Sequence, residues 1–193
     1  MIVVSTGQST VEQILDGYAR SFVGSLSGPV VTAHLRSPAS TAAQVQNQLQ
    51  STPKVALCFF GHGLVPPLAG FLADDGNPAV DKTNIALLSG RTVVATCCFG
   101  DQVGALAPAN GFSLFGYAGG LHVPLHPRHV RDTERAALAA PRAVATGASP
   151  QSAAKTAKTE FRLLAHYLYG RNQAGDRPYA LLAGINATIA NAW

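Results

Sequence analysis

A histidine and two cysteines stand at the ends of two apolar segments of the chain. His62 follows the apolar run 55–60 after one glycine, and Cys97 and Cys98 end the run that begins at Thr92. A cysteine attacks as its thiolate, and a nearby imidazole can take its proton or stabilise its charge. Flanking glycines let a substrate backbone approach and leave amide N–H groups free to bind an oxyanion. These residue types suit nucleophilic hydrolysis if the fold brings the two segments together.

A structural explanation competes with the chemical one for the same residues. Cysteine is among the most buried residue types, and a histidine at a strand end can simply cap backbone groups. The only other cysteine, Cys58, lies inside the run 55–60 and is expected in the core. Three cysteines cannot form a closed disulfide set, and the adjacent Cys97 and Cys98 would bridge only with strain. We therefore expect a reducing, cytoplasmic environment.

The surrounding elements alternate between strands and helices. A capping-box pattern at Ser9 and Glu12 predicts the start of the first helix, and Gly28-Pro29 is expected to break it. Apolar periodicity predicts strands at 2–6, 30–35, 55–60, 92–97, 113–118 and 179–189, a hairpin around 71–76, and helices near 10–26, 42–52, 85–89, 131–140 and 150–170. This pattern predicts one doubly wound α/β domain over residues 1–193 with a mainly parallel sheet. In such sheets, ligands bind at the carboxyl ends of the strands, where His62 and the cysteines are expected.

Composition excludes several classes of protein. Charged residues make up only 12% of the 193 residues, and hydrophobic residues 47%, which argues against disorder. Residues 1–7 lack the pattern of a signal peptide, and no apolar run approaches the roughly 18 residues of a membrane span, so no membrane partner is expected. The net charge of +4 arises in residues 101–193, which carry nine basic and five acidic side chains. No aromatic-basic motif accompanies this surplus, so we favour solvated helix faces and expect no nucleic-acid partner.

A second histidine cluster follows the segment 113–118. His122, His126 and His129 have a spacing that could suit zinc, but no acidic residue or cysteine accompanies them in the loop 119–127. We therefore predict a solvated loop or groove wall, with no metal and no other cofactor. Arg128, in the same stretch, is a weaker candidate for contacting an acidic substrate residue.

The order of these motifs resembles that of the caspase-like cysteine peptidases, and more narrowly the CHAT domains. The similarity is carried by FFGHG at 59–63, FLADDG at 71–76, VVATCC at 93–98, the helix after Ser149-Pro150, and PYALLAG at 178–184. The resemblance implies a caspase-like three-layer sandwich around a central, mainly parallel sheet of about six strands. It also implies a cysteine endopeptidase with a Cys-His dyad and no cofactor.

Roles for individual residues follow from that resemblance. Cys98 would attack the scissile carbonyl, His62 would protonate the leaving amine, and the backbone N–H groups of Gly63 and Cys98 would form the oxyanion hole. Cys98 is preferred because Gly100 follows two residues later. Adjacent side chains of a strand point to opposite faces, so only one cysteine should face His62, and Cys97 remains the alternative.

Substrate recognition and partners are less specified. The candidate substrate-binding residues are Asp101, which is the acidic residue nearest the cysteine motif, Tyr117, whose segment 115–120 ends a strand and should border the substrate groove, and Thr96. Thr96 stands where some relatives have an aspartate. Other acidic candidates are Asp16, Asp74 and Asp75. We expect a protein or peptide substrate and an activating partner protein.

Two alternatives stay open: an inactive interaction module of the same fold, and another α/β hydrolase that uses His62-Gly63 as an oxyanion loop. The second lacks a Gly-x-Ser-x-Gly nucleophile motif.

Overall fold

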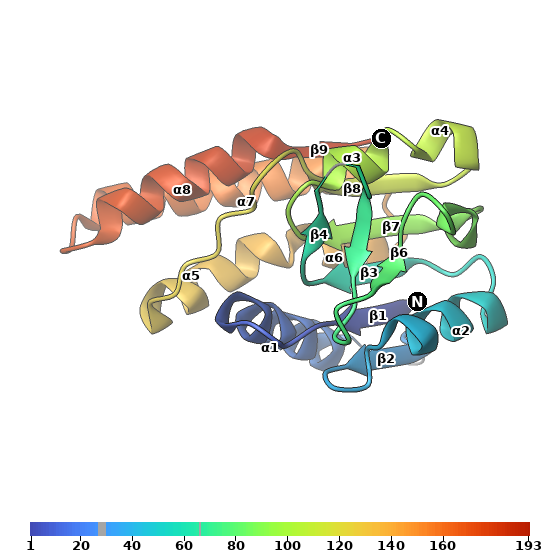
Figure 1. The fold of residues 1–193 in the computed structure, drawn as a ribbon. Helices are drawn as coiled ribbons and strands as arrows, with labels where there is room; N and C mark the ends of the chain where they lie inside the picture. The colour runs from blue at the N-terminus through green and yellow to red at the C-terminus, as the bar shows by residue number, and fades with distance from the viewer. Residues whose placement is uncertain (27–29, 66) are drawn as a thin grey trace.

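The centre of the protein is a six-stranded sheet within residues 1–26, 30–65 and 67–193, which the computed structural model describes (Figure 1). The strand order is β2-β1-β3-β7-β8-β9, in which only β9 runs antiparallel to its neighbour. The strands are β1 (Ile2–Ser5), β2 (Ala33–Arg36), β3 (Leu57–Phe60), β7 (Thr92–Thr96), β8 (Ser113–Tyr117) and β9 (Ala190–Ala192). The predicted α/β class with a mainly parallel sheet of about six strands is therefore confirmed.

Helices cover both faces of this sheet and produce three layers. One face carries α1 (Thr10–Ser25), α5 (Pro127–Ala137), α6 (Ala139–Ala145), α7 (Pro150–Arg171) and α8 (Asp176–Ile189). The other carries α2 (Ala42–Ser51), the 3-10 helix η1 (Ile85–Leu88), α3 (Gly100–Gly104) and α4 (Ala107–Asn110). Within the described ranges, no helix combines the length and apolar character needed to cross a membrane.

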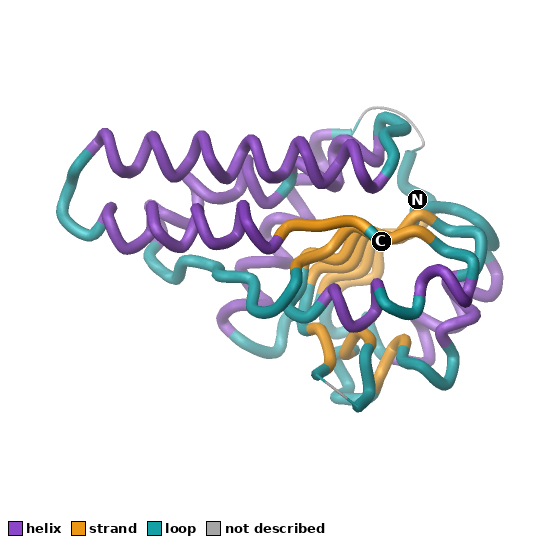
Figure 2. Tube along the Cα trace, turned by 90° about the horizontal axis from the view of Figure 1, so that it is seen from above, coloured by secondary structure: helices purple, strands orange, loops and turns teal. Residues whose placement is uncertain are grey.

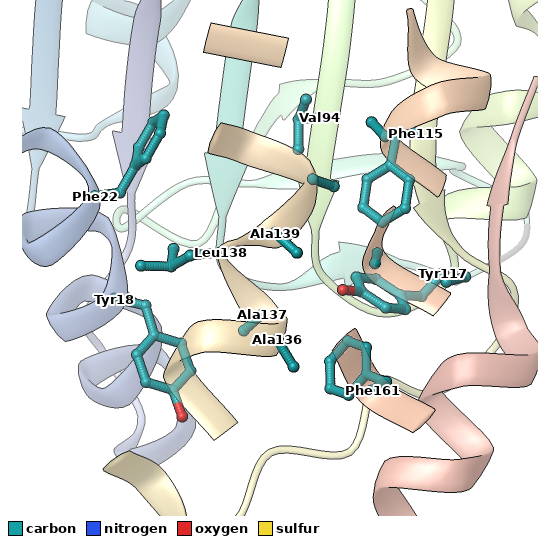
Figure 3. Packing of buried hydrophobic residues seen from close by; sticks show 14 of the residues in the cluster. Tyr18, Phe22, Val94, Phe115, Tyr117, Ala136, Ala137, Leu138, Ala139 and Phe161 are labelled. Carbon is teal, nitrogen blue, oxygen red and sulfur yellow. The ribbon is translucent and has the colours of Figure 1, made fainter. Parts of the chain in front are cut away.

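The central strands are apolar because both of their faces are buried. Successive side chains of β3 enter opposite cores: Phe60 joins the cluster that contains Phe22, whereas Phe59 stacks on Phe71 in the other cluster. Figure 3 shows the first core, in which Tyr117 lies against Phe115 and Phe161. A parallel strand covered on both faces reads as a continuous apolar run, which is why its position was predictable.

A small antiparallel sheet follows His62. It consists of β4 (Gly63–Leu64), β5 (Gly70–Leu72) and β6 (Pro78–Val80). The pairing of β5 with β6 confirms the hairpin predicted around residues 71–76. Phe71 is fully buried beneath the main sheet, so this hairpin fixes the segment that carries His62 to the core.

Local capping signals define two of the helices as predicted. Ser9 and Glu12 form the reciprocal capping box that begins α1, and Ser149 caps α7 with Pro150 in its first turn. Helix α1 ends at Ser25, whereas the helix-breaking pair Gly28-Pro29 lies outside the described residues.

The predicted strand over residues 179–189 is wrong, and with it the resemblance of PYALLAG to a closing strand. This segment is the helix α8, and the last strand is only the short β9 after it. Ala180, Ala183 and Ala187 are buried at helical spacing, and alanine has the highest helix propensity of all residues. The segment therefore buries a narrow stripe of small side chains against α7 rather than alternating across a sheet.

Candidate functional site

The histidine and the cysteines emerge side by side because β3 and β7 are neighbours. The two strands pair in parallel with Phe60 opposite Thr96, and Gly61 N donates to Thr96 O at 3.4 Å. Both strands therefore end at the same edge of the sheet, and the segments that carry His62 and Cys98 follow directly. The strands β3 and β7 are therefore adjacent in the sheet, which the sequence left as a condition for a shared site.

The three cysteines differ in accessibility. Cys58 and Cys97 are buried, with exposed fractions of 0% and 1%, whereas Cys98 is partly exposed, and all three thiols are free. Burial raises the pKa of the Cys58 thiol to about 12 and also raises the pKa of Cys97 well above its ordinary value. Of the three, Cys98 is the thiol that a substrate can reach.

The loop 118–121, which follows β8, wraps around the Cys98 side chain. Leu121 N donates to Cys98 Sγ at 3.3 Å, and Gly119 O accepts from Phe99 N at 2.7 Å. The same sulfur lies 3.9 Å from Leu121 O, so both backbone groups of Leu121 hold the Cys98 side chain in place. The chain turns sharply just after the cysteine, where Phe99 has a left-handed φ of 57°. Such backbone strain is concentrated at functional sites, because the surrounding structure must enforce it.

Gly63 lies against the Cys98 backbone. A Cβ placed on Gly63 would stand 1.8 Å from Cys98 O, so only glycine allows this approach. His62 O accepts from Leu72 N at 3.0 Å within the antiparallel pairing, so the next N–H, that of Gly63, points away from β5. In the described part of the chain, the Cys98 N–H has no acceptor. Within the described residues, the N–H groups of Gly63 and Cys98 are therefore left without acceptors where the histidine and cysteine segments meet.

The His62 ring is anchored from the start of α1. Its Nε2 lies 3.3 Å from Ser9 Oγ and 3.7 Å from Glu12 Oε2, and 43% of the side chain is exposed. The Glu12 carboxylate is buried and fixed, because it accepts from Thr6 Oγ1 at 2.6 Å and from Ser9 N at 2.7 Å. Among the described residues, no hydrogen bond joins His62 to a cysteine, and its Nδ1 has no partner. Nδ1 is thus the ring nitrogen left to serve a reacting group.

Ser9 and Glu12 were not recognised as site residues from the sequence, which indicated only a capping box. The signal that places them here is the order of the sheet. They follow β1, and β1 is the other neighbour of β3. A carboxylate that holds one nitrogen of a histidine has the general form in which a third group orients an acid–base imidazole.

The three proposed substrate-binding residues have different positions. Asp101 is half-buried, and its carboxylate accepts from Gly119 N at 3.3 Å, so it anchors the loop beside Cys98. Thr96 and Tyr117 are fully buried. Their side chains therefore cannot contact a substrate, which corrects the sequence-based expectation. Both lie at strand ends near the site, but they belong to the core.

The other acidic candidates have structural partners. Asp16 accepts hydrogen bonds from Ser5 and Arg36, and its pKa is lowered because those hydrogen bonds outweigh the effect of burial. Asp74 accepts from Gly7 N at 2.9 Å, and Asp75 accepts from Ala42 N at 3.3 Å. None of these contacts needs a substrate to explain it.

Two histidines of the second cluster have structural roles, and the expected solvated position is wrong for His129. His126 caps α5, and His129 is buried and stacks on Tyr179. Arg128 and His129 both lie beside the carboxylate of Asp176, so the arginine is engaged within the protein. In the ranges that the structure describes, no group of three potential ligands is arranged to hold a metal ion.

Comparison with known proteins adds no assignment. No family model matches the sequence, and no curated protein matches it significantly.

Proposed function

We propose that this chain is a cysteine endopeptidase in which Cys98 is the nucleophile and His62 is the acid–base group. The observation that carries the proposal is that Cys98 and His62 lie at the same edge of the sheet. The Cys98 thiol is partly exposed and accepts a hydrogen bond from a backbone N–H. One nitrogen of the His62 imidazole is anchored, and the other is free within the described residues. The two buried cysteines cannot take this part without local opening of the core.

The proposed reaction uses the groups in a fixed order. The Cys98 thiol gives its proton to His62 as its sulfur attacks the scissile carbonyl carbon, and the N–H groups of Gly63 and Cys98 stabilise the negative oxygen that results. His62 gives this proton to the leaving amine as the C–N bond breaks, which leaves an acyl group on the sulfur. Water then attacks this thioester and gives a proton to His62, and His62 returns the proton to the sulfur as the C–S bond breaks, which releases the carboxylic acid product and restores the Cys98 thiol.

Ser9 and Glu12 act in this scheme as positioning residues. They hold Nε2 of His62, so that Nδ1 serves the thiol and the leaving group. Asp101 contributes in the same indirect way, because its contact with Gly119 N holds the loop that donates to Cys98.

The finer fold assignment is part of the proposal. A caspase-like sandwich of the CHAT type is supported by the succession of a central strand, His62, an antiparallel hairpin and the neighbouring strand β7, whose end at Thr96 is followed two residues later by Cys98. On this assignment the substrate is a protein or peptide, the enzyme is cytoplasmic, and a partner protein controls it.

The proposal is tested by incubating the reduced chain with an unbiased peptide library and identifying cleaved bonds by mass spectrometry. Wild type and Cys97→Ala should cleave the same bonds, whereas Cys98→Ala and His62→Ala should lose cleavage. Cleavage that persists in Cys98→Ala contradicts the assignment of the nucleophile. If neither wild type nor any variant cleaves a peptide, and Cys98 does not react with alkylating agents, the proposal that the chain is an enzyme is contradicted.

One observation favours the alternative of an inactive interaction module. No hydrogen bond links His62 and Cys98 within the described residues, although catalytic contacts are often loose before substrate binds. For such a module, His62→Ala would leave the alkylation rate of Cys98 unchanged. If the chain is an enzyme, His62→Ala lowers the alkylation rate of Cys98.

A further inference from the structure

The helices α7 and α8 form an antiparallel hairpin that extends past the sheet. Figures 1 and 2 show the two helices side by side, with their connection far from the strands. On the inner side, Phe161, Leu164 and Leu168 of α7 enter the core together with Ala183 and Ala187 of α8. The opposite side of the hairpin is not used by this packing, and it carries two features that the peptidase proposal leaves unexplained.

The first feature is an apolar hollow between the two helices. It has a volume of about 690 Å³. Ala165 contributes a small side chain to it, Gly184 contributes backbone only, and Tyr169, Leu181 and Ile185 contribute large side chains. Tyr169 and Leu181 are each 67% exposed. Single exposed apolar residues are normal, but a contiguous group around a hollow is typical of a binding site.

The second feature is a row of basic residues along the same side of α7. Lys158, Arg162 and His166 follow one another at intervals of four residues, and Tyr169 continues the stripe. With a rise of about 1.5 Å per residue, the row is about 12 Å long. His166 lines the hollow, and Arg177 lines it at the end where the two helices connect. Among the residues that the structure describes, none of those lining the hollow is acidic.

The acidic residues of the C-terminal half are all engaged elsewhere. Each of the five has a partner: Asp101 with Gly119 N, Asp132 with Arg171, Glu134 with Ser21, Glu160 with Arg135, and Asp176 with Arg128 and Arg171. In the described ranges, neither Lys158 nor Arg162 has an acidic partner within 4.0 Å. Three of the nine basic residues in residues 101–193 are therefore placed at this hollow or next to it: Arg177 lines the hollow, and Lys158 and Arg162 lie on the α7 stripe that continues from it.

We propose that the hollow between α7 and α8 binds an acidic amphipathic helix of a partner protein. A helix laid into a groove offers apolar side chains at every third or fourth residue, which suits the wall formed by Tyr169, Leu181 and Ile185. Carboxylates one turn apart on its flank match the four-residue spacing of Lys158, Arg162 and His166. This proposal is independent of the peptidase activity.

Charge also distinguishes this occupant from two others. A second copy related by a two-fold axis would set the same basic row against itself, and like charges facing each other are unfavourable. A nucleic acid would satisfy the basic row through its phosphates, but it would have no need of the apolar wall at Leu181 and Ile185.

The test is selection from a display library of 20-residue helices with randomised surface positions, using the whole chain as target. We expect the selected helices to carry Asp or Glu at four-residue spacing beside an apolar stripe, with affinities on the order of 1–100 μM for a small interface. Leu181→Glu and Arg162→Glu should each weaken binding of the selected helices by about tenfold or more.

Two matched substitutions control for general effects. Leu163 is 53% exposed on another side of α7, and Arg131 is exposed on α5, so Leu163→Glu and Arg131→Glu make the same chemical changes outside the hollow. Both should bind the selected helices as wild type does. The proposal is overturned if no helix is enriched, if the enriched helices are not acidic, or if the controls weaken binding as much as Leu181→Glu. The proposal is also overturned if a single-stranded oligonucleotide binds more tightly than the selected helices and if Leu181→Glu and Leu163→Glu weaken that binding equally.

Discussion

The contact between Gly63 and Cys98 makes the geometry of the site sensitive to a single methyl group. In Gly63→Ala, the new Cβ would stand 1.8 Å from Cys98 O and 2.9 Å from Cys98 C. Both neighbouring atoms belong to the backbone, so no side chain can rotate away. The histidine segment and the cysteine segment must separate by more than about 1 Å to admit the methyl group.

The expected cost has two opposing parts. Overpacking of this kind destabilises a protein by about 1–3 kcal/mol. Replacing glycine by alanine also restricts the unfolded chain, which returns about 0.4–1 kcal/mol. The free energy of unfolding should therefore fall by about 1–2 kcal/mol. Displacement of the reacting groups by about 1 Å should lower kcat/KM by on the order of 100-fold.

Urea unfolding measures the first effect, and peptide cleavage together with the alkylation rate of Cys98 measures the second. Gly120→Ala is the matched control, because no atom lies within 4 Å of its added Cβ. That variant should unfold within about 0.5 kcal/mol of wild type. If Gly63→Ala matches wild type in stability and in Cys98 alkylation, the close approach does not exist in solution and the proposed oxyanion site loses its basis.

Three further results are expected. Glu12→Gln preserves the capping box but removes the charge beside His62, so kcat for peptide cleavage should fall about 10- to 100-fold with KM unchanged, and in a His62→Ala background the same substitution should leave the alkylation rate of Cys98 unchanged. Hydrogen bonds from Arg171 lower the pKa of Asp176 to about 2. The contribution of Asp176 to the free energy of unfolding should therefore be present above about pH 4 and lost as the pH falls toward about 2. Urea unfolding across that range should show a smaller loss of stability in Asp176→Asn than in wild type. Iodoacetamide should modify Cys98 in the native chain and should modify Cys97 only in urea, as peptide mapping will show.

The part of the fold that positions the site was predictable from local patterns. The runs 55–60 and 92–97 are apolar because β3 and β7 are buried on both faces, and such runs are visible without knowing the partners. Their successive positions in a mainly parallel sheet then predicted that His62 and Cys98 would share an edge. The burial of Cys97 beside the partly exposed Cys98 matches the expected difference, but its cause is the turn that follows β7, because β7 ends at Thr96.

Features that depend on tertiary partners were missed. The segment 179–189 is apolar enough for a strand, and its helical form is decided by packing of small side chains against α7. The capping box of Glu12 was visible, but its proximity to His62 depends on β1 lying next to β3, which no local pattern encodes. Tyr117 was expected at the substrate groove because of its strand-end position, yet its ring turns toward Phe161 and the core.

The central claim is that Cys98 reacts as a nucleophile assisted by His62. Its most direct test is the rate and the site of modification by a peptide that carries a thiol-reactive acylating group, followed by intact-mass measurement and peptide mapping. We predict one adduct per native chain, located on Cys98, formed on the order of 100-fold more slowly in His62→Ala. An adduct on Cys97, or a Cys98 adduct that forms at the same rate with and without His62, would contradict the account.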